Sequence, residues 1–242
     1  MLEALSPQPE EPTESKDEFL AMVSHELRTP IIAILGWIEL LDKARLDQAL
    51  MAQAVEVIKR NAQLQVKLVE DLLDYSRITA NKLSLTTRVI SLEPIIKAAI
   101  NAMIPMARKK LIDVEMEVVS SEGELEGDSL RLQQVFSNLL SNAIKFTPSG
   151  GNVRVKLETL DAYHTVMVSD TGEGISAEFL PFIFDRYRQA NRPDAGRGGL
   201  GLGLTITHYI VELHGGTIQA ASDGQGQGAV FTIQLPHKQS RQ

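Results

Sequence analysis

The sequence predicts an α+β protein in two parts, a helical hairpin followed by a layered α/β domain. Over residues 16–85, apolar side chains recur at three- and four-residue steps, the spacing of amphipathic helices. Beyond residue 85, short β-branched runs alternate with helical stretches, and only some pairs of runs have a helix between them. A length of 242 residues suits one large domain or two modest ones.

Both ends of the chain are polar. Residues 1–15 hold three prolines and four glutamates and show no helical stripe, which is typical of a linker. Residues 237–242 form a polar tail that we expect to be frayed.

The first part reads as two long helices joined by a polar break at residues 43–47. One apolar stripe runs from Phe19 to Leu41, and a second runs from Leu50 to Tyr75 with a heptad rhythm. A hairpin alone leaves apolar surface uncovered, whereas a second copy would complete a four-helix bundle. The pattern therefore predicts a homodimer.

The second part, residues 86–236, predicts an α/β sandwich whose sheet is mostly antiparallel or mixed. We expect strands at residues 114–119, 153–157, 165–168, 217–220 and 230–235. We expect helices at residues 93–110, 129–146 and 202–214.

Composition excludes several classes of protein. The net charge is −7 and only twelve residues are Phe, Tyr or Trp, which argues against binding nucleic acid. The absence of cysteine excludes disulfides and thiolate metal sites, and it suits a cytoplasmic location. The longest nearly uninterrupted apolar run, residues 31–41, is shorter than the ~20 residues that span a bilayer, so we expect no membrane segment.

A first candidate site lies on the first helix, in the segment SHELRTP. An imidazole is partly unprotonated near neutral pH, so His25 could act as a nucleophile, and the adjacent Glu26 could orient its ring or take its proton. Thr29 lies one turn further on the same face, and Pro30 removes a helical hydrogen bond beside the histidine. The alternative is a surface histidine beside a helix kink.

A second candidate site begins on the helix predicted at residues 129–146. Asn138, Asn142 and Lys145 follow at i, i+4 and i+7, so they share one face. Amide oxygens suit Mg²⁺, and a lysine can balance the charge of a phosphate. The alternative is that the asparagines are merely structural.

Glycine clusters extend this second site. Asp170 follows a strand and precedes Gly172 and Gly174, so its carboxylate could accept a hydrogen bond from an adenine amino group, although an ordinary turn would look the same. The run GGLGLG at residues 198–203 opens a helix, where backbone N–H groups can bind phosphate. Neither a Rossmann nor a P-loop pattern is present. Four arginines between the two clusters suggest a basic lid.

These segments together resemble the transmitter core of a bacterial sensor histidine kinase. SHELRTP resembles the phosphoacceptor box, NLLSNAIKFTP the asparagine box, FIFDRYRQA the phenylalanine box, and DTGEGI and GLGLGL the two glycine boxes. Five motifs in family order span residues 16–236. The resemblance implies a dimerisation and phosphotransfer hairpin, followed by an ATP-binding domain of the Bergerat type.

The resemblance also implies residue roles. His25 is the phosphorylated residue, Glu26 is its base or orienting partner, and Thr29 positions water in members with phosphatase activity. Asn138 ligates Mg²⁺, and Asp170 reads adenine. Thr232 supports Asp170, and Arg188 is our choice to meet the γ-phosphate, because Gln189 replaces the usual arginine. The remaining expected nucleotide contacts are Asn142, Lys145, Phe146, Gly172, Gly174, Gly199, Gly201 and Gly203.

The expected activity is ATP-dependent autophosphorylation of His25, followed by transfer to an aspartate of a response-regulator receiver domain. The resemblance leaves a phosphatase activity open as a further reaction. Two alternatives stay open. One is a Bergerat-fold ATPase that couples nucleotide to dimer closure without labelling a histidine. The other is a dimeric interaction module without activity.

Overall fold

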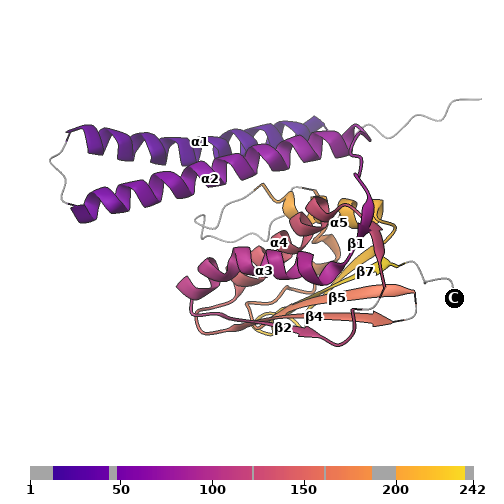
Figure 1. The fold of residues 1–242 in the computed structure, drawn as a ribbon. Helices are drawn as coiled ribbons and strands as arrows, with labels where there is room; N and C mark the ends of the chain where they lie inside the picture. The colour runs from indigo at the N-terminus through magenta and orange to yellow at the C-terminus, as the bar shows by residue number, and fades with distance from the viewer. Residues whose placement is uncertain (1–12, 44–47, 122, 161, 187–199, 238–242) are drawn as a thin grey trace, which may run out of the picture. The chain divides into compact units, whose positions relative to one another are not determined.

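A computed structural model describes residues 13–43, 48–121, 123–160, 162–186 and 200–237 (Figure 1). These residues form two compact units. The first contains α1 and α2 as far as Leu72, and the second begins at Leu73 and contains the other helices and all strands. The predicted boundary at residue 85 between hairpin and ATP-binding domain stays a prediction.

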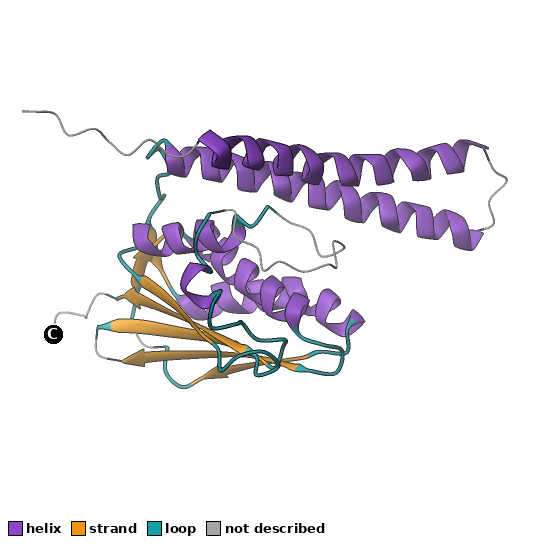
Figure 2. Ribbon diagram, turned by 180° about the vertical axis from the view of Figure 1, so that it is seen from behind, coloured by secondary structure: helices purple, strands orange, loops and turns teal. Residues whose placement is uncertain are grey.

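The first unit is a helical hairpin, in agreement with the sequence. α1 spans Thr13–Lys43 and α2 spans Gln48–Thr79, and the two helices lie side by side (Figures 1 and 2). α1 begins three residues before its predicted start and runs on through Pro30 as a single helix. Along the hairpin, Pro30, Ala54 and Leu68 are buried.

The second unit is built on a five-stranded mixed sheet, as predicted. Its strand order is β2-β4-β5-β7-β6, in which β2 and β4 run parallel and the other neighbours run antiparallel. The strands are β2 (Asp113–Val118), β4 (Asn152–Leu160), β5 (Tyr163–Asp170), β6 (Thr217–Ala221) and β7 (Ala229–Pro236). β1 (Arg88–Ile90) and β3 (Leu125–Gly127) form a separate antiparallel pair that the sequence did not predict.

Three helices cover one face of this sheet (Figure 2). They are α3 (Leu92–Lys109), α4 (Ser129–Phe146) and α5 (Gly203–Leu213), and a short 3₁₀ helix, η1, spans Leu180–Phe182. Buried side chains alternate along β4 and β5, as expected for a sheet packed on one side. The other face of the sheet carries ion pairs such as Arg154–Glu115 at 3.0 Å. The expected two-layer sandwich is confirmed.

The start of α4 is fixed by side chains. Asp128 is the N-cap residue, and its carboxylate accepts hydrogen bonds from the backbone N–H groups of Leu130, Arg131 and Thr86. These bonds hold the pKa of Asp128 below its ordinary value, although burial opposes them. The helix that carries the asparagines therefore has a firmly placed beginning.

Among the described residues, no helix is long and apolar enough to cross a membrane.

Candidate functional site

The hairpin presents His25 to solvent. The His25 side chain is 77% exposed, and its Nδ1 lies 3.6 Å from Glu26 Oε1, an ion-pair distance longer than a hydrogen bond. Thr29 Oγ1 donates a hydrogen bond to the carbonyl oxygen of His25 at 3.0 Å. The structure therefore brings these three predicted residues together, with the Glu26 carboxylate on the Nδ1 side of the ring.

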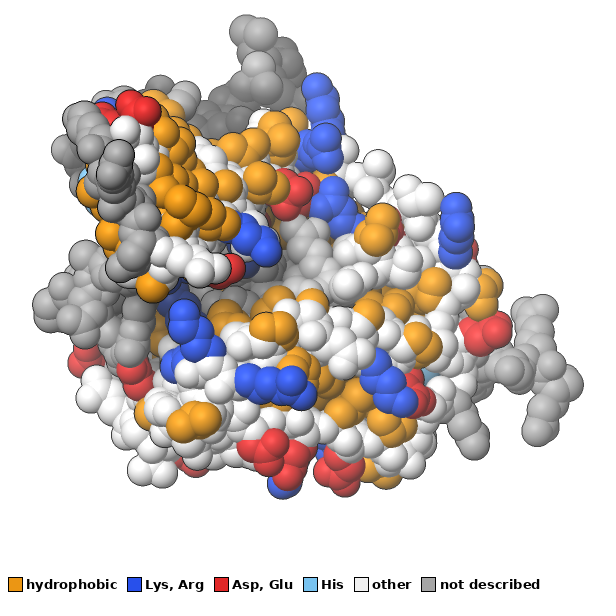
Figure 3. Space-filling view, turned by 60° about the vertical axis from the view of Figure 1, so that its left-hand side comes forward, with side chains coloured by type: hydrophobic (Ala, Val, Ile, Leu, Met, Phe, Trp, Pro, Cys, Tyr) orange, Lys and Arg blue, Asp and Glu red, His pale blue; other side chains and the backbone are white. Residues whose placement is uncertain are grey.

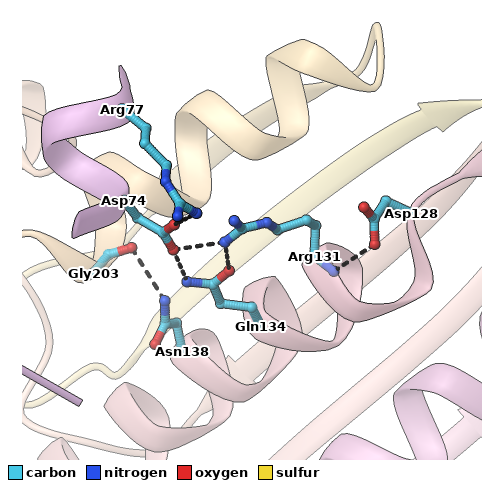
Figure 4. Close-up of polar contacts among 7 residues, drawn as sticks. All are labelled: Asp74, Arg77, Asp128, Arg131, Gln134, Asn138 and Gly203. Carbon is cyan, nitrogen blue, oxygen red and sulfur yellow. Dashed lines mark hydrogen bonds and ion pairs between the residues drawn. The ribbon is translucent and has the colours of Figure 1, made fainter. Parts of the chain in front are cut away.

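In the second unit, Asn138 lies on α4 beside the start of α5. Asn138 is only 6% exposed, and its Nδ2 donates to the carbonyl oxygen of Gly203 at 3.5 Å (Figure 4). With the amide nitrogen facing Gly203, the amide oxygen points the other way. An amide oxygen is a hard ligand of the kind Mg²⁺ prefers, so the chemistry of this residue fits that metal.

The last turn of α4 carries three further predicted residues. Asn142 and Lys145 are half-buried, and Lys145 Nζ lies 5.1 Å from the centroid of the exposed Phe146 ring. The carbonyl oxygen of Phe146 accepts a hydrogen bond from the Glu173 N–H at 3.1 Å. The asparagine helix and the loop after β5 are thus joined through their backbones.

Gly172 permits this close approach. A Cβ at Gly172 would lie 2.7 Å from the carbonyl oxygen of Phe146 and 2.6 Å from Asp170 Oδ1. Real Cβ atoms do not come this near to oxygen, so any larger residue would displace the loop or the helix end. Gly174 lies two residues further along the same loop.

Asp170 ends β5 with its carboxylate partly buried. Burial raises the pKa of Asp170, and hydrogen bonds from the backbone N–H groups of Gly172 and Ala229 oppose that rise without cancelling it. The bond from Gly172 to Asp170 Oδ1 is 2.8 Å long. A half-buried, fixed carboxylate of this kind can accept a hydrogen bond from an amino group such as that of adenine.

The structure does not bring Thr232 to Asp170, so the support expected from Thr232 is wrong. In the pairing of β5 with β7, Asp170 lies opposite Ala229 and Thr232 lies opposite Met167. Because side chains alternate along a strand, Thr232 faces the other side of the sheet from Asp170. The neighbour on the same face as Asp170 is Ala229, which could not be predicted because the sequence of one strand does not give its register against the next.

The part of the second glycine cluster that the structure describes leads directly into α5. Gly201 has a φ of +67°, which glycine adopts without strain, and Gly203 is the first residue of α5. The N-cap residue, Leu202, makes no side-chain hydrogen bond to the first backbone N–H groups of α5. These N–H groups point out of the end of the helix without a capping side chain. Such an end suits a phosphate. Gly199 and Arg188 lie outside the described residues.

The segment before the predicted lid is anchored by Phe184. Its ring stacks on His208 of α5 at 5.3 Å and meets Phe231 of β7 edge-on at 6.4 Å, both measured between ring centroids. Thr205 Oγ1 donates to the carbonyl oxygen of Phe184 at 3.0 Å. The resemblance pointed to this phenylalanine box, but the sequence did not show which phenylalanine fixes it.

A buried polar cluster lies one turn before Asn138. The Asp74 carboxylate accepts hydrogen bonds from Arg131 Nη1 at 2.6 Å and from Gln134 Nε2 at 2.8 Å (Figure 4). Asp74 was not among the site residues expected from the sequence. The only feature of the sequence that marked Asp74 was its position as a carboxylate within the apolar stripe of a helix.

Two protein families match the chain. Residues 15–81 match the family described as "His Kinase A (phospho-acceptor) domain", and residues 127–239 match "Histidine kinase-, DNA gyrase B-, and HSP90-like ATPase". The first covers His25, and the second covers Asn138, Asp170 and the glycine-rich segments.

Relatives of the whole chain agree. The chain is 36% identical to hybrid signal transduction histidine kinase D of Dictyostelium discoideum over 92% of its own length, and it spans 17% of that relative. Among solved structures, full-length ShkA in complex with AMPPNP is 29% identical with a TM-score of 0.68, covering 93% of this chain and 47% of that one.

A second solved structure, of the histidine kinase ThkA in complex with the response regulator protein TrrA, is 26% identical with a TM-score of 0.67. It covers 91% of this chain and 61% of that one. The expected resemblance is confirmed. With a phosphoacceptor hairpin followed by an ATPase domain, the chain belongs to the sensor histidine kinases, as a transmitter core.

Proposed function

We propose that this chain transfers the γ-phosphoryl group of ATP to His25 and passes it on to an aspartate of a receiver domain. The observation that carries the proposal is the arrangement at His25, an exposed imidazole whose Nδ1 faces the Glu26 carboxylate at 3.6 Å. A proton held on Nδ1 leaves Nε2 as the unprotonated nitrogen, which is the form able to attack phosphorus.

The reaction balances as an in-line displacement. A bond forms between His25 Nε2 and the γ-phosphorus while the bond from that phosphorus to the β–γ bridging oxygen breaks, and ADP leaves. Attack places positive charge on the imidazole, which the Glu26 carboxylate offsets. The second transfer moves the phosphoryl group from nitrogen to a carboxylate oxygen and regenerates neutral His25.

The second unit supplies the nucleotide site. ATP binding follows from the match to the ATPase family, and we assign its contacts to the residues that the structure gathers around α4 and the loop after β5. Asp170 accepts a hydrogen bond from the adenine amino group, Lys145 faces the phosphates, and the start of α5 at Gly201 and Gly203 donates N–H groups to them. Asn142, Phe146, Gly172 and Gly174 complete the contacts.

Asn138 would hold Mg²⁺ through its amide oxygen. Bound there, Mg²⁺ would neutralise charge on the phosphate oxygens of the nucleotide. Arg188 is proposed to add positive charge at the γ-phosphate, and Gly199 is proposed to belong to the phosphate-binding turn.

The proposed partners are a response-regulator receiver domain and a second copy of the chain. ThkA was solved with the response regulator TrrA, which supports the first. Apolar side chains exposed along the hairpin support the second (Figure 3). Thr29, one turn from His25, is proposed to position water when the partner is dephosphorylated. The proposed location is the cytoplasm.

Incubation with γ-³²P-labelled ATP and Mg²⁺ tests the proposal. We expect a label that is acid-labile and alkali-stable, that is absent from H25A, and that moves to a receiver domain added later. H237A is the matched control, because His237 follows the end of β7 and makes none of the proposed nucleotide contacts. Equal labelling of wild type and H25A would contradict the assignment, and phosphate release without any label would favour the ATPase alternative.

A further inference from the structure

We propose that Lys110 is a positioning residue for nucleotide binding, acting through the last turn of α4. The inference rests on the proposed function, because it names a residue that holds that same nucleotide site in place. Lys110 was not among the residues expected from the sequence. It is the C-cap residue of α3 and so belongs to a different element from every proposed nucleotide contact.

The Lys110 ammonium group hydrogen-bonds to the end of α4. Its Nζ donates hydrogen bonds to the carbonyl oxygens of Ile144 at 2.7 Å, Lys145 at 3.0 Å and Thr147 at 2.6 Å. An ammonium group has three N–H donors, enough for these three bonds to backbone carbonyl groups. The ammonium group of Lys110 is thus directed at the end of α4.

These bonds complete the backbone hydrogen bonding where a helix normally lacks partners. The last carbonyl groups of an α-helix have no partner within the helix. Here Lys110 donates to the carbonyl oxygens of Ile144 and Lys145. The Glu173 N–H donates to that of Phe146, and the N–H and hydroxyl of Thr147 donate to that of Ala143. The positive charge also lies at the negative end of the helix dipole.

The backbone of Lys110 is held in the same place. Its carbonyl oxygen accepts hydrogen bonds from Ser149 Oγ at 2.8 Å and from the Gly150 N–H at 3.2 Å, both in the loop that follows α4. Next to it, Leu111 adopts a left-handed φ of +54°, which turns the chain from α3 toward β2. Lys110 is thereby joined to α4 and its following loop through both side chain and backbone.

The turn that Lys110 holds bears Asn142, Lys145 and Phe146. It also carries the Phe146 carbonyl oxygen that lies against Gly172 in the Asp170 loop. Displacement of this turn would move the proposed phosphate contact and the proposed adenine loop together. Asn138, a full turn or more earlier in α4, would move less.

The test compares K110M, which keeps the length of the side chain and removes its charge and donors, with K109M, the same change at the exposed neighbour. Binding of a fluorescent ATP analogue and steady-state autophosphorylation are measured for both variants and for wild type. We expect K110M to raise the Kd and the KM for ATP about tenfold while kcat at saturating ATP stays within threefold. K109M should stay within twofold on every measure.

A Kd for K110M equal to that of wild type would overturn the proposal, and so would a loss confined to kcat. If wild type itself does not bind the analogue, the proposed function fails and the role of Lys110 fails with it, whereas normal binding by wild type and K110M alike removes only the role of Lys110. K110Q, which keeps two N–H donors, provides a milder variant if K110M does not fold, and we expect its Kd to rise about threefold. Failure of both variants to fold would assign Lys110 to stability alone.

Discussion

Arg131 Nη1 lies 2.6 Å from the Asp74 carboxylate, which is 7% exposed, and so joins α4 to the final turns of α2 through a buried ion pair. Gln134 Nε2 donates to the same carboxylate oxygen at 2.8 Å. Asn138 follows one turn later on α4. The cluster therefore helps to fix the position of α4, the helix that carries the proposed magnesium ligand.

Removing Asp74 should loosen α4. In D74A, Arg131 keeps its charge in a mostly buried place without its carboxylate, at a cost of about 3 kcal/mol. Hydrogen exchange followed by mass spectrometry should show faster exchange of the α4 amides. R77A is the control, because Arg77 is 56% exposed and lies 4.0 Å from Asp74. Its effect should stay within about 0.5 kcal/mol, and equal protection of α4 in D74A and wild type would contradict the expectation.

His214 predicts a pH dependence of stability. Its Nδ1 donates to the carbonyl oxygen of Ile210 at 2.7 Å and its Nε2 accepts from the Asp128 N–H at 3.0 Å, so the ring is bonded in its neutral form. Burial lowers the pKa of His214, although the Ile210 bond and the Asp128 charge oppose this. The folded state thus binds fewer protons than the unfolded state, and stability rises with pH.

The loss on acidification should begin as pH falls through the unfolded pKa of about 6.5 and be complete below the folded pKa. In H214Q, an amide can replace both bonds without titrating, so the slope of stability against pH should flatten by up to about 1.4 kcal/mol per pH unit. Thermal unfolding at pH 5.5, 6.5 and 7.5 measures this. His164, whose pKa burial also lowers, leaves a remaining slope in H214Q. A wild-type slope in H214Q would exclude His214 as its source.

How far the sequence alone determines this structure differs from element to element. The predicted helix at residues 129–146 coincides with α4, because an N-cap aspartate precedes it and Thr147-Pro148 ends it. β1 and β3 were missed because three residues are too few to show alternation and because their partners, such as Val89 and Glu126, are far apart in the chain.

The same limit applies to the candidate site. His25, Glu26 and Thr29 are neighbours along one helix, so spacing alone predicted that they lie together. Asp74 and Arg131 are 57 residues apart, and no local pattern marks them as partners. Thr232 was misplaced for a related reason, because its face of the sheet depends on the register of β5 against β7.

Substitution of Asp170 should change which base is preferred. D170N loses a charged acceptor for the adenine amino group, and its affinity for ATP should fall about tenfold, since a hydrogen bond to a charged group contributes roughly 1.5–3 kcal/mol. Its amide can instead donate to the carbonyl oxygen of guanine, so the preference for ATP over GTP should narrow. Calorimetric titration with both nucleotides measures the ratio. D223N, at an exposed aspartate, should leave the ratio unchanged, and an unaltered ratio in D170N would remove Asp170 from base recognition.

The exposed apolar face of α1 should form the dimer interface. Ile31, Leu35 and Ile38 follow at i, i+4 and i+7, and all three are more than 40% exposed in a single hairpin. On α2, the exposed Val55, Val66 and Val69 also share one face. Such stripes on both helices of a hairpin are what a second copy would bury in a four-helix bundle.

L35D should therefore dissociate the dimer, because a two-fold interface buries the new carboxylate twice and each unpaired buried charge costs roughly 3 kcal/mol. Light scattering after gel filtration should show the mass of two chains for wild type and of one chain for L35D at micromolar concentration. I32D is the matched control. Ile32 is 60% exposed but lies off the line of Ile31, Leu35 and Ile38, so its substitution should leave the mass of two chains. Dissociation by I32D with a dimeric L35D would place the interface on the other face of α1.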